Sequence, residues 1–302
     1  MSFTPIAIKS GLPSKANNRT FMCYGDTRSG KTRFAGTFPN ALFISDKSER
    51  GWTTLETMPG TDFYHSDKAP LVLGVIDRQE MTEALTKAEQ LVRMGLIDTL
   101  VVDSLTFYAE SWYQSEQKKM ISAGANAKLD TRALFGALSS HLADIRMMIH
   151  EWGCNVVWTA LASPPEDGRQ GGPMVSGKSR ERFPAGCDHI FRHRRYDAVD
   201  DDNQPVVVYE ARTCAADGYV GGGRDSGALP DTIPWPTYRT VAEYLGLPEV
   251  DPKLVPPELL IEPVGAAAST AASTAPIAPR QVTRRAPPPR RAVTPSAAVT
   301  TK

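Results

Sequence analysis

The feature that most constrains the fold is the stretch FMCYGDTRSGKTRFAG, residues 21–36. Four residues that favour strands run into Gly25, and four small or polar residues separate that glycine from Gly30-Lys31-Thr32. The residues KTRFAGTF then have the composition of a helix start. A strand, a glycine-bounded loop and a helix in direct succession form either an ordinary strand-to-helix turn or a phosphate site, and their repetition along the chain predicts βαβ units and therefore an α/β protein.

Strand and helix patterns alternate along the rest of the chain. Apolar runs at 41–45, 99–103 and 155–161 are nearly continuous, as expected for a parallel sheet covered on both faces. We also predict strands at 20–24, 62–65, 189–194 and 206–213, and helices at 82–94 and 130–152, the latter capped by Asp130. The last two strands flank the polar turn AVDDDNQP and predict an antiparallel hairpin at the sheet edge.

Residues 25–32, GDTRSGKT, match the pattern GxxxxGK[ST] at every fixed position. In such a P-loop the backbone N–H groups surround phosphate oxygens, the lysine reaches the β- and γ-phosphates, and the threonine hydroxyl faces Mg²⁺. The sequence therefore predicts ATP and Mg²⁺ as ligands. The predicted nucleotide-binding residues are Gly25, Asp26, Thr27, Arg28, Ser29, Gly30, Lys31, Thr32 and Arg33.

The segment LIDTLVVDS, residues 96–104, is an apolar strand that ends in Asp103 about 70 residues after the loop. A carboxylate at the carboxyl end of a strand beside the P-loop is the Walker B element that orients the water shell of Mg²⁺. We therefore predict that Thr32 and Asp103 share a metal ion, and that Lys31 and Asp103 belong to the catalytic machinery.

The order of these segments resembles the core of RecA-type ATPases. After VVDS come a helix, the strand VVWTALAS, a glycine-rich polar stretch and DHIFRHRR. The compact size and the closing GYVGGGRDSGALPDTIP resemble the short RecA-like ATPases of bacteriophages, which are linked to single-strand annealing and recombination. The resemblance spans roughly residues 10–247 and implies a RecA-like P-loop NTPase core, with a mainly parallel sheet, flanking helices and an antiparallel edge hairpin.

The resemblance also implies roles for particular residues. A catalytic glutamate follows the strand after the P-loop helix, where this chain has DKSERG, so Glu49 or Asp46 would polarise the attacking water. Arg224, in GGGRD, would be inserted into a neighbouring subunit's nucleotide site. Ser163 or Thr159 would sense the γ-phosphate at the end of VVWTALAS, where glutamine or histidine is more usual.

The resemblance implies single-stranded DNA as a partner as well. The glycine-punctuated segment 163–187 carries Arg169, Lys178, Arg180 and Arg182, and such a loop suits contacts to a phosphate backbone. We expect a homo-oligomer, either a ring or a filament, with ATP at subunit interfaces. A single-strand-binding protein is a further candidate partner.

Other P-loop activities remain open. A kinase of a nucleotide or small molecule would need a lid with convergent arginines, which SGKSRERF offers, and an acceptor pocket. A GTPase would show an N/TKxD motif after a strand, and the sequence has none. A helicase-loading or packaging ATPase would share the same core, and the sequence separates it poorly from a recombination ATPase.

Composition sets the domain organisation. Residues 264–302 are rich in Ala, Ser, Thr and Pro and hold six of the 34 basic residues and no acid, which leaves 28 basic against 34 acidic residues in 1–263. We predict an ATPase domain over 1–250, a lead-out over 251–263 and a disordered basic tail over 264–302. We expect a soluble protein without a membrane partner, in the cytoplasm or, for a phage-encoded chain, the host cytoplasm.

Overall fold

A computed structural model describes residues 18–122, 131–199, 203–225, 227–256 and 259. Contacts divide the chain into two units, Met1–Ile261 and Glu262–Lys302. The second unit lies outside the described residues, and so do the predicted tail and Asp130, the predicted cap. In the described part of the chain, no helix combines the length and apolar character that crossing a membrane requires.

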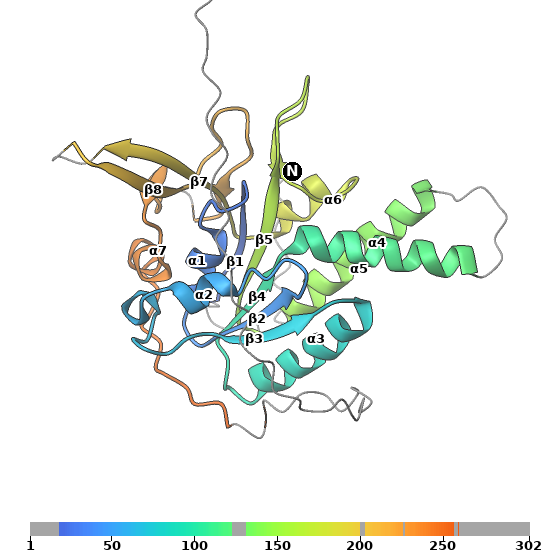
Figure 1. Ribbon diagram of the computed structural model, residues 1–302, viewed down its shortest axis with the longest axis horizontal. Helices are drawn as coiled ribbons and strands as arrows, with labels where there is room; N and C mark the ends of the chain where they lie inside the picture. The colour runs from blue at the N-terminus through green and yellow to red at the C-terminus, as the bar shows by residue number, and fades with distance from the viewer. Residues whose placement is uncertain (1–17, 123–130, 200–202, 226, 257–258, 260–302) are drawn as a thin grey trace, which may run out of the picture. The chain divides into compact units, whose positions relative to one another are not determined.

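The first unit is built on one large sheet (Figure 1). Its strands are β1 (Thr20–Gly25), β2 (Ala41–Asp46), β3 (Leu71–Val75), β4 (Thr99–Asp103), β5 (Asn155–Ser163), β6 (Gly172–Pro173), β7 (His189–Val199), β8 (Pro205–Arg212), β9 (Gly222–Gly223) and β10 (Thr232–Pro234). The main path runs β10-β8-β7-β1-β5-β4-β2-β3, with β6 paired to β5 and β9 to β7. The neighbours from β7 through β3 are parallel, and the other pairs are antiparallel. The predicted α/β fold with a mainly parallel sheet is confirmed.

Helices cover both faces of this sheet, and each face has its own apolar core. The helices are α1 (Lys31–Gly36), α2 (Thr53–Thr57), α3 (Arg78–Arg93), α4 (Leu105–Ser122), α5 (Thr131–His150), α6 (Ser179–Arg182) and α7 (Tyr238–Leu245), with short 3-10 turns at Gly60–Asp62 and Pro184–Gly186. Met22 and Tyr24 of β1 face the core under α3, α4 and α5. Phe21 and Cys23 alternate to the other face, under α1, α2 and α7. Full burial on both faces explains why β1, β2 and β4 read as continuous apolar runs.

Two predictions about elements need correction, and one strand was missed. Residues 62–65 do not form a strand; they end a 3-10 turn and enter a bend, and Phe63 is buried there as a core side chain. The strand that pairs with β2 is β3, at 71–75. The hairpin of β7 and β8 is antiparallel as predicted, but it is not the sheet edge: β7 pairs with β1, and β10 pairs with the outer side of β8.

The beginning of the predicted lead-out packs on the domain. The Lys253 backbone N–H donates to Asn40 Oδ1 at 2.9 Å, and Lys253 Nζ lies 2.5 Å from Asp98 Oδ1. Asn40 also donates to the carbonyl of Asp251 at 2.8 Å. These contacts attach residues 251–253 to the loops at the amino ends of β2 and β4.

Candidate nucleotide-binding site

The loop between β1 and α1 requires its two outer glycines for steric reasons. A Cβ at Gly25 would lie 2.2 Å from the carbonyl oxygen of His193, since β7 runs directly alongside β1. Gly30 has φ 93°, and a Cβ there would lie 2.9 Å from the ring of Tyr209. Arg28 also adopts a positive φ, 63°. The first backbone N–H groups of α1 have no partner within the helix, so they are available to an anion held by the loop.

Lys31 is buried under this loop. Its Nζ donates to the carbonyls of Gly25, at 3.0 Å, and Asp26, at 2.8 Å. Burial lowers the pKa of the lysine, and the nearby carboxylates of Asp103 and Glu49 oppose that effect. Phosphate oxygens are stronger acceptors than carbonyls because they carry charge. Lys31 is therefore positioned to donate to a phosphate inside the loop.

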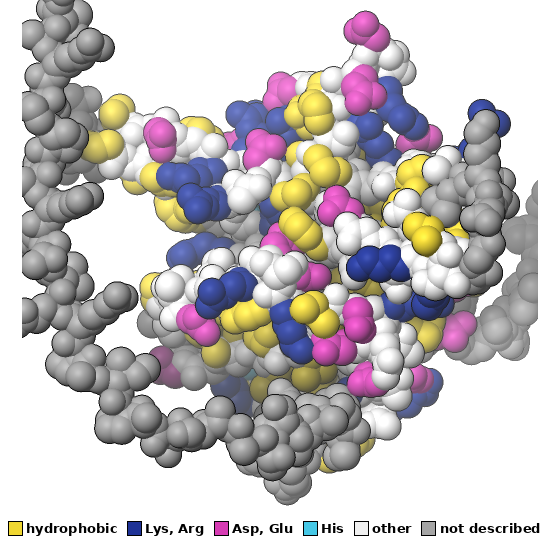
Figure 2. Space-filling view, turned by 45° about the vertical axis from the view of Figure 1, so that its right-hand side comes forward, with side chains coloured by type: hydrophobic (Ala, Val, Ile, Leu, Met, Phe, Trp, Pro, Cys, Tyr) yellow, Lys and Arg dark blue, Asp and Glu magenta, His cyan; other side chains and the backbone are white. Residues whose placement is uncertain are grey.

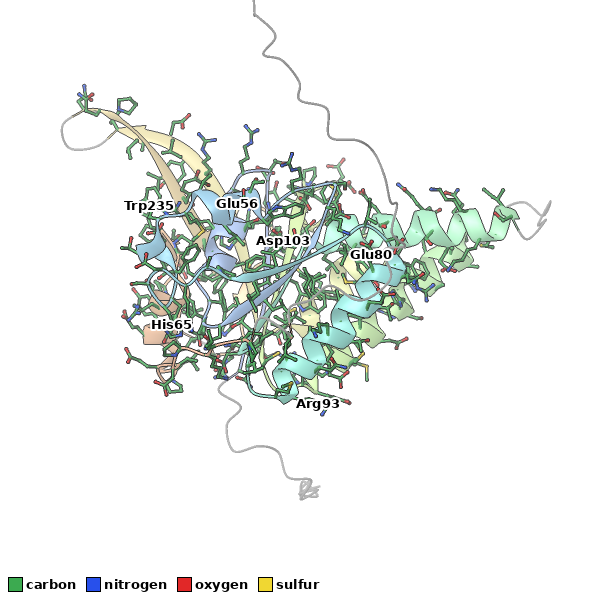
Figure 3. The ribbon with its side chains drawn as sticks, turned by 60° about the horizontal axis from the view of Figure 1, so that its bottom comes forward. Glu56, His65, Glu80, Arg93, Asp103 and Trp235 are labelled. Carbon is green, nitrogen blue, oxygen red and sulfur yellow. The ribbon has the colours of Figure 1, made fainter. Side chains whose placement is uncertain are left out.

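Asp103 lies at the end of β4 and contacts the P-loop threonine directly. Thr32 Oγ1 donates to Asp103 Oδ2 at 2.9 Å, and Thr159 of β5 donates to Asp103 Oδ1. We predicted that the strand bearing Asp103 lies beside the P-loop strand, and this is wrong, because β5 lies between β1 and β4. The side chains still meet because parallel strands present their carboxyl ends at one edge of the sheet. In the view of Figure 3, Asp103 lies near the middle of the described domain, between Glu56 and Glu80.

Glu49 lies beside Asp103, in the loop after β2. Its Oε2 accepts a hydrogen bond from Ser104 Oγ at 3.0 Å. Desolvation, reinforced by the charge of Asp103, raises the pKa of Glu49 to about 7. A Cβ at Gly51 would lie 2.7 Å from Asp103 Oδ2, so the absence of a side chain there lets the loop approach Asp103.

Asp46, the alternative to Glu49, has a structural task. Its Oδ1 accepts from the backbone N–H of Ser48 at 2.7 Å and of Glu49 at 3.2 Å, and it also accepts from the Ser48 hydroxyl. Aspartate side chains commonly hold turns in this way. Asp46 therefore orders the loop that carries Glu49.

The oxygen ligands of Thr32 and Asp103 fit Mg²⁺, which prefers hard oxygen donors and keeps several waters. Asp103 is 3% exposed, and desolvation raises its pKa. A cation at this point would offset the burial of the carboxylate charge. Among the described residues, no group of three or more His, Cys, Asp or Glu side chains could hold a metal. A metal bound here would therefore depend on phosphate oxygens and water for its remaining ligands.

The structure separates the two predicted sensors. Thr159 is fully buried in the middle of β5, and its hydroxyl positions Asp103. Ser163 pairs with Gly172 of β6. It lines a cavity together with Thr106 and Arg180, and no P-loop residue lines that cavity.

Arg224 does not approach its own P-loop. It follows β9, which pairs with β7 at His189 and Ile190, beside the amino end of β1. Its guanidinium donates to the Ala185 carbonyl at 3.2 Å and lies 3.7 Å from Asp188.

The four predicted DNA-binding residues lie together in the segment after β5, but their environments differ. Lys178 and Arg182 are exposed. Arg180 donates to the carbonyls of Pro164, at 3.1 Å, and Gln170, at 2.9 Å, and so connects both ends of the preceding loop. Arg169 pairs with Glu181 at 3.0 Å. On the face drawn in Figure 2, basic and acidic side chains are interspersed among apolar groups.

The fold and this site define a P-loop nucleotide-binding protein. A family model described as an AAA domain matches residues 17–224, which include the loop, Glu49, Asp103 and the segment after β5. The chain therefore belongs to this AAA domain family. Membership indicates nucleotide binding and hydrolysis. A search of curated proteins finds no match.

Several residues of the site were not predicted from the sequence. Gly51 and Ser104 act by close approach and by a hydrogen bond to groups distant in the chain. The aromatic residues Tyr209 and Trp235 border the P-loop from β8 and from the segment after β10. A tryptophan between two prolines, in the segment IPWPT, was the available signal for the second of these.

Proposed function

We propose that this chain is a magnesium-dependent ATPase whose hydrolysis is coupled to single-stranded DNA. The observation that carries the catalytic part is the 2.9 Å contact between Thr32 Oγ1 and Asp103 Oδ2, which joins the phosphate loop to a buried carboxylate. Mg²⁺ would bind between these oxygens and the phosphates, where it would neutralise charge on the transferring phosphoryl group.

Glu49 is the residue we assign as general base. A general base works best when its pKa lies near the operating pH, and the Glu49 pKa of about 7 meets that condition. Its hydrogen bond to Ser104 holds the carboxylate next to Asp103. Lys31 would stabilise the phosphate charge from inside the loop.

The DNA part of the proposal rests on the segment after β5. This segment and the P-loop both begin where parallel strands end, on the same side of the sheet, because Leu161 of β5 pairs with Gly25 of β1. Exposed Lys178 and Arg182 would contact the phosphate backbone, and Arg180 would hold the loop that presents them.

A chain of contacts supports coupling between this segment and hydrolysis. Thr106, three residues after Asp103, donates to the Met174 carbonyl at 2.9 Å and accepts from the Leu161 N–H at 3.0 Å. A shift of the segment on DNA would therefore act directly on the start of α4 and on the carboxylate before it.

We also propose that the chain assembles as a ring or filament in which Arg224 serves a neighbour's site. The distance of Arg224 from its own P-loop along the sheet favours action in trans. Its exposed side chain is compatible with a neighbour's phosphates.

The test is hydrolysis of ATP with and without single-stranded DNA, with mass measured in parallel. We expect turnover that needs Mg²⁺, rises on DNA and disappears in Lys31→Ala. If DNA does not change the hydrolysis rate but a nucleoside monophosphate raises it, the result would contradict this proposal and favour a nucleotide kinase.

A further inference from the structure

A cavity adjoins the P-loop on the side away from Asp103. It provides about 180 Å³ of space that the centre of a water molecule can reach. One enclosed water needs only about 10–15 Å³ of such space, so the cavity has room for a group of many atoms. Gly30 and Arg33 line it, and these residues flank Lys31 and Thr32 in the chain.

Tyr209, which lines the cavity, and the carboxylates of Asp103 and Glu49 come from opposite sides of the P-loop strand. In the sheet order, β5, β4 and β2 lie on one side of β1 and carry Asp103 and the loop of Glu49. On the other side are β7, β8 and β10, and Tyr209 of β8 lines the cavity. In Figure 3, Trp235 lies at the side of the sheet where β7 and β8 extend, away from Asp103. A nucleotide whose terminal phosphates face Asp103 would direct its nucleoside toward this cavity.

Two aromatic rings form one wall. Tyr209 and Trp235 are in edge contact, with ring centroids 5.4 Å apart. The backbone N–H of Trp235 donates to the backbone carbonyl of Tyr209 at 2.8 Å, which holds the two residues together. Trp235 has φ 46°, a conformation that bulky residues rarely adopt, and it is 48% exposed. Its backbone is thus held so that a large aromatic side chain stays at the surface beside a phosphate loop.

Polar and charged side chains line the same cavity. Arg33 forms an ion pair with Asp62, and both side chains remain partly exposed. The carboxylate of Asp62 retains acceptor capacity for an amino or hydroxyl group of a ligand. Aromatic surface and a charged pair in one cavity can serve a nucleoside, because the rings stack on the base and the polar groups form hydrogen bonds with its edge.

We infer that this cavity binds the nucleoside of the nucleotide, and that Trp235 and Tyr209 select a purine base by stacking. The inference rests on the proposed nucleotide binding at the P-loop. Purines have the larger aromatic surface, so they gain more from this wall than pyrimidines do.

The experiment compares ADP with inorganic pyrophosphate, which shares the two phosphates but lacks the nucleoside. Binding of each, with Mg²⁺, is measured by calorimetry in the full chain. We expect Trp235→Ala to weaken ADP binding roughly 5- to 100-fold and to leave pyrophosphate binding unchanged. Trp235→Phe should lose less. Tyr244→Ala, which removes an exposed aromatic residue of α7, is the matched control and should change neither ligand.

Base selection is tested with ADP, GDP and CDP. Wild type should bind both purine nucleotides more tightly than CDP, and Trp235→Ala should reduce that preference. Unchanged ADP binding in Trp235→Ala, or equal loss of ADP and pyrophosphate, would overturn the inference. If wild type binds pyrophosphate as tightly as ADP, the result would support the phosphate site and contradict the nucleoside site. If wild type binds neither ligand, both proposals fall.

Discussion

The hydroxyl of Thr106 donates to the backbone carbonyl of Met174 at 2.9 Å. It thereby connects the helix that begins after Asp103 to the segment proposed to meet DNA. The same oxygen accepts from the Leu161 N–H, so one buried side chain satisfies groups on two elements. This contact gives the proposed coupling a single residue on which it can be tested.

We expect Thr106→Val to keep basal hydrolysis and to lose most stimulation by single-stranded DNA. Valine has nearly the same shape but leaves the Leu161 N–H and the Met174 carbonyl unpaired, at a stability cost of about 1–3 kcal/mol. Thr106→Ser, which keeps the hydroxyl, should retain stimulation. Full stimulation in Thr106→Val would show that coupling takes another route. The measurements are hydrolysis rates with and without DNA, and a melting curve.

The contact between Thr32 and Asp103 predicts a metal-specific defect. Thr32→Val removes one oxygen ligand, so Mg²⁺ should no longer strengthen ADP binding, with a loss of roughly 10- to 100-fold. Binding in EDTA should be nearly unchanged, because the loop N–H groups remain. Thr32→Ser serves as the control. Equal loss with and without Mg²⁺ would indicate a damaged loop rather than a missing ligand.

Glu49 predicts a pH dependence of stability in metal-free protein. Because its pKa rises from 4.5 to about 7 on folding, the protonated form is favoured in the native state. The resulting stability is fully present below pH 4.5 and is lost as pH rises through about 7. Glu49→Gln should therefore melt like wild type near pH 4.5.

At pH 8 the same variant should melt a few degrees higher than wild type, reflecting on the order of 1–3 kcal/mol. Its hydrolysis should be strongly reduced at pH 8, where the wild-type carboxylate is ionised and can act as the general base. Glu56→Gln, in the exposed part of α2, is the control and should show no pH-dependent gain. A pH-independent difference for Glu49→Gln would mean that its carboxyl is not desolvated.

Arg224 predicts complementation between subunits. β9 pairs with β7 at His189, which in turn pairs with Phe21 at the amino end of β1. Gly25 lies four residues after Phe21, about 13 Å further along the strand. Arg224→Ala and Lys31→Ala should each be inactive, whereas a mixture should recover part of the activity because some interfaces combine two intact halves. An inactive mixture, or an active Arg224→Ala protein, would contradict the role in trans.

If the segment after β5 binds DNA as we propose, its exposed basic residues predict a change in the salt dependence of binding. Replacing exposed Lys178 and Arg182 together by Ala should weaken binding of single-stranded DNA. The slope of log K against log salt should become less steep by roughly 1.4, because each contact contributes about 0.7. Arg93 and Lys118, exposed on α3 and α4, provide a matched double variant that should leave the slope unchanged. An unchanged slope in the first pair would place the DNA site elsewhere.

Local pattern was sufficient for the strand, the glycine loop and the position of Lys31 and Thr32, because their geometry depends on neighbours in the chain. It was sufficient for Asp103 too, since a buried strand that ends in a carboxylate is visible over a few residues. Local pattern failed at 62–65, where the aromatic residues Phe63 and Tyr64 suggested a strand. In the structure Phe63 is buried and Tyr64 is half-buried, but neither lies in a strand. Those rings pack against the apolar core under α1, α2 and α7, and a short window of sequence cannot show such packing.

Only the tertiary structure decided how the site is completed. The sequence left Asp46 as an alternative to Glu49, and the hydrogen bonds of Asp46 within its own turn separate the two. The insertion of β5 between β1 and β4 brings Thr159 to Asp103, and β8 brings Tyr209 against Gly30. These contacts join residues far apart in the chain through sheet order, which short-range propensities do not encode.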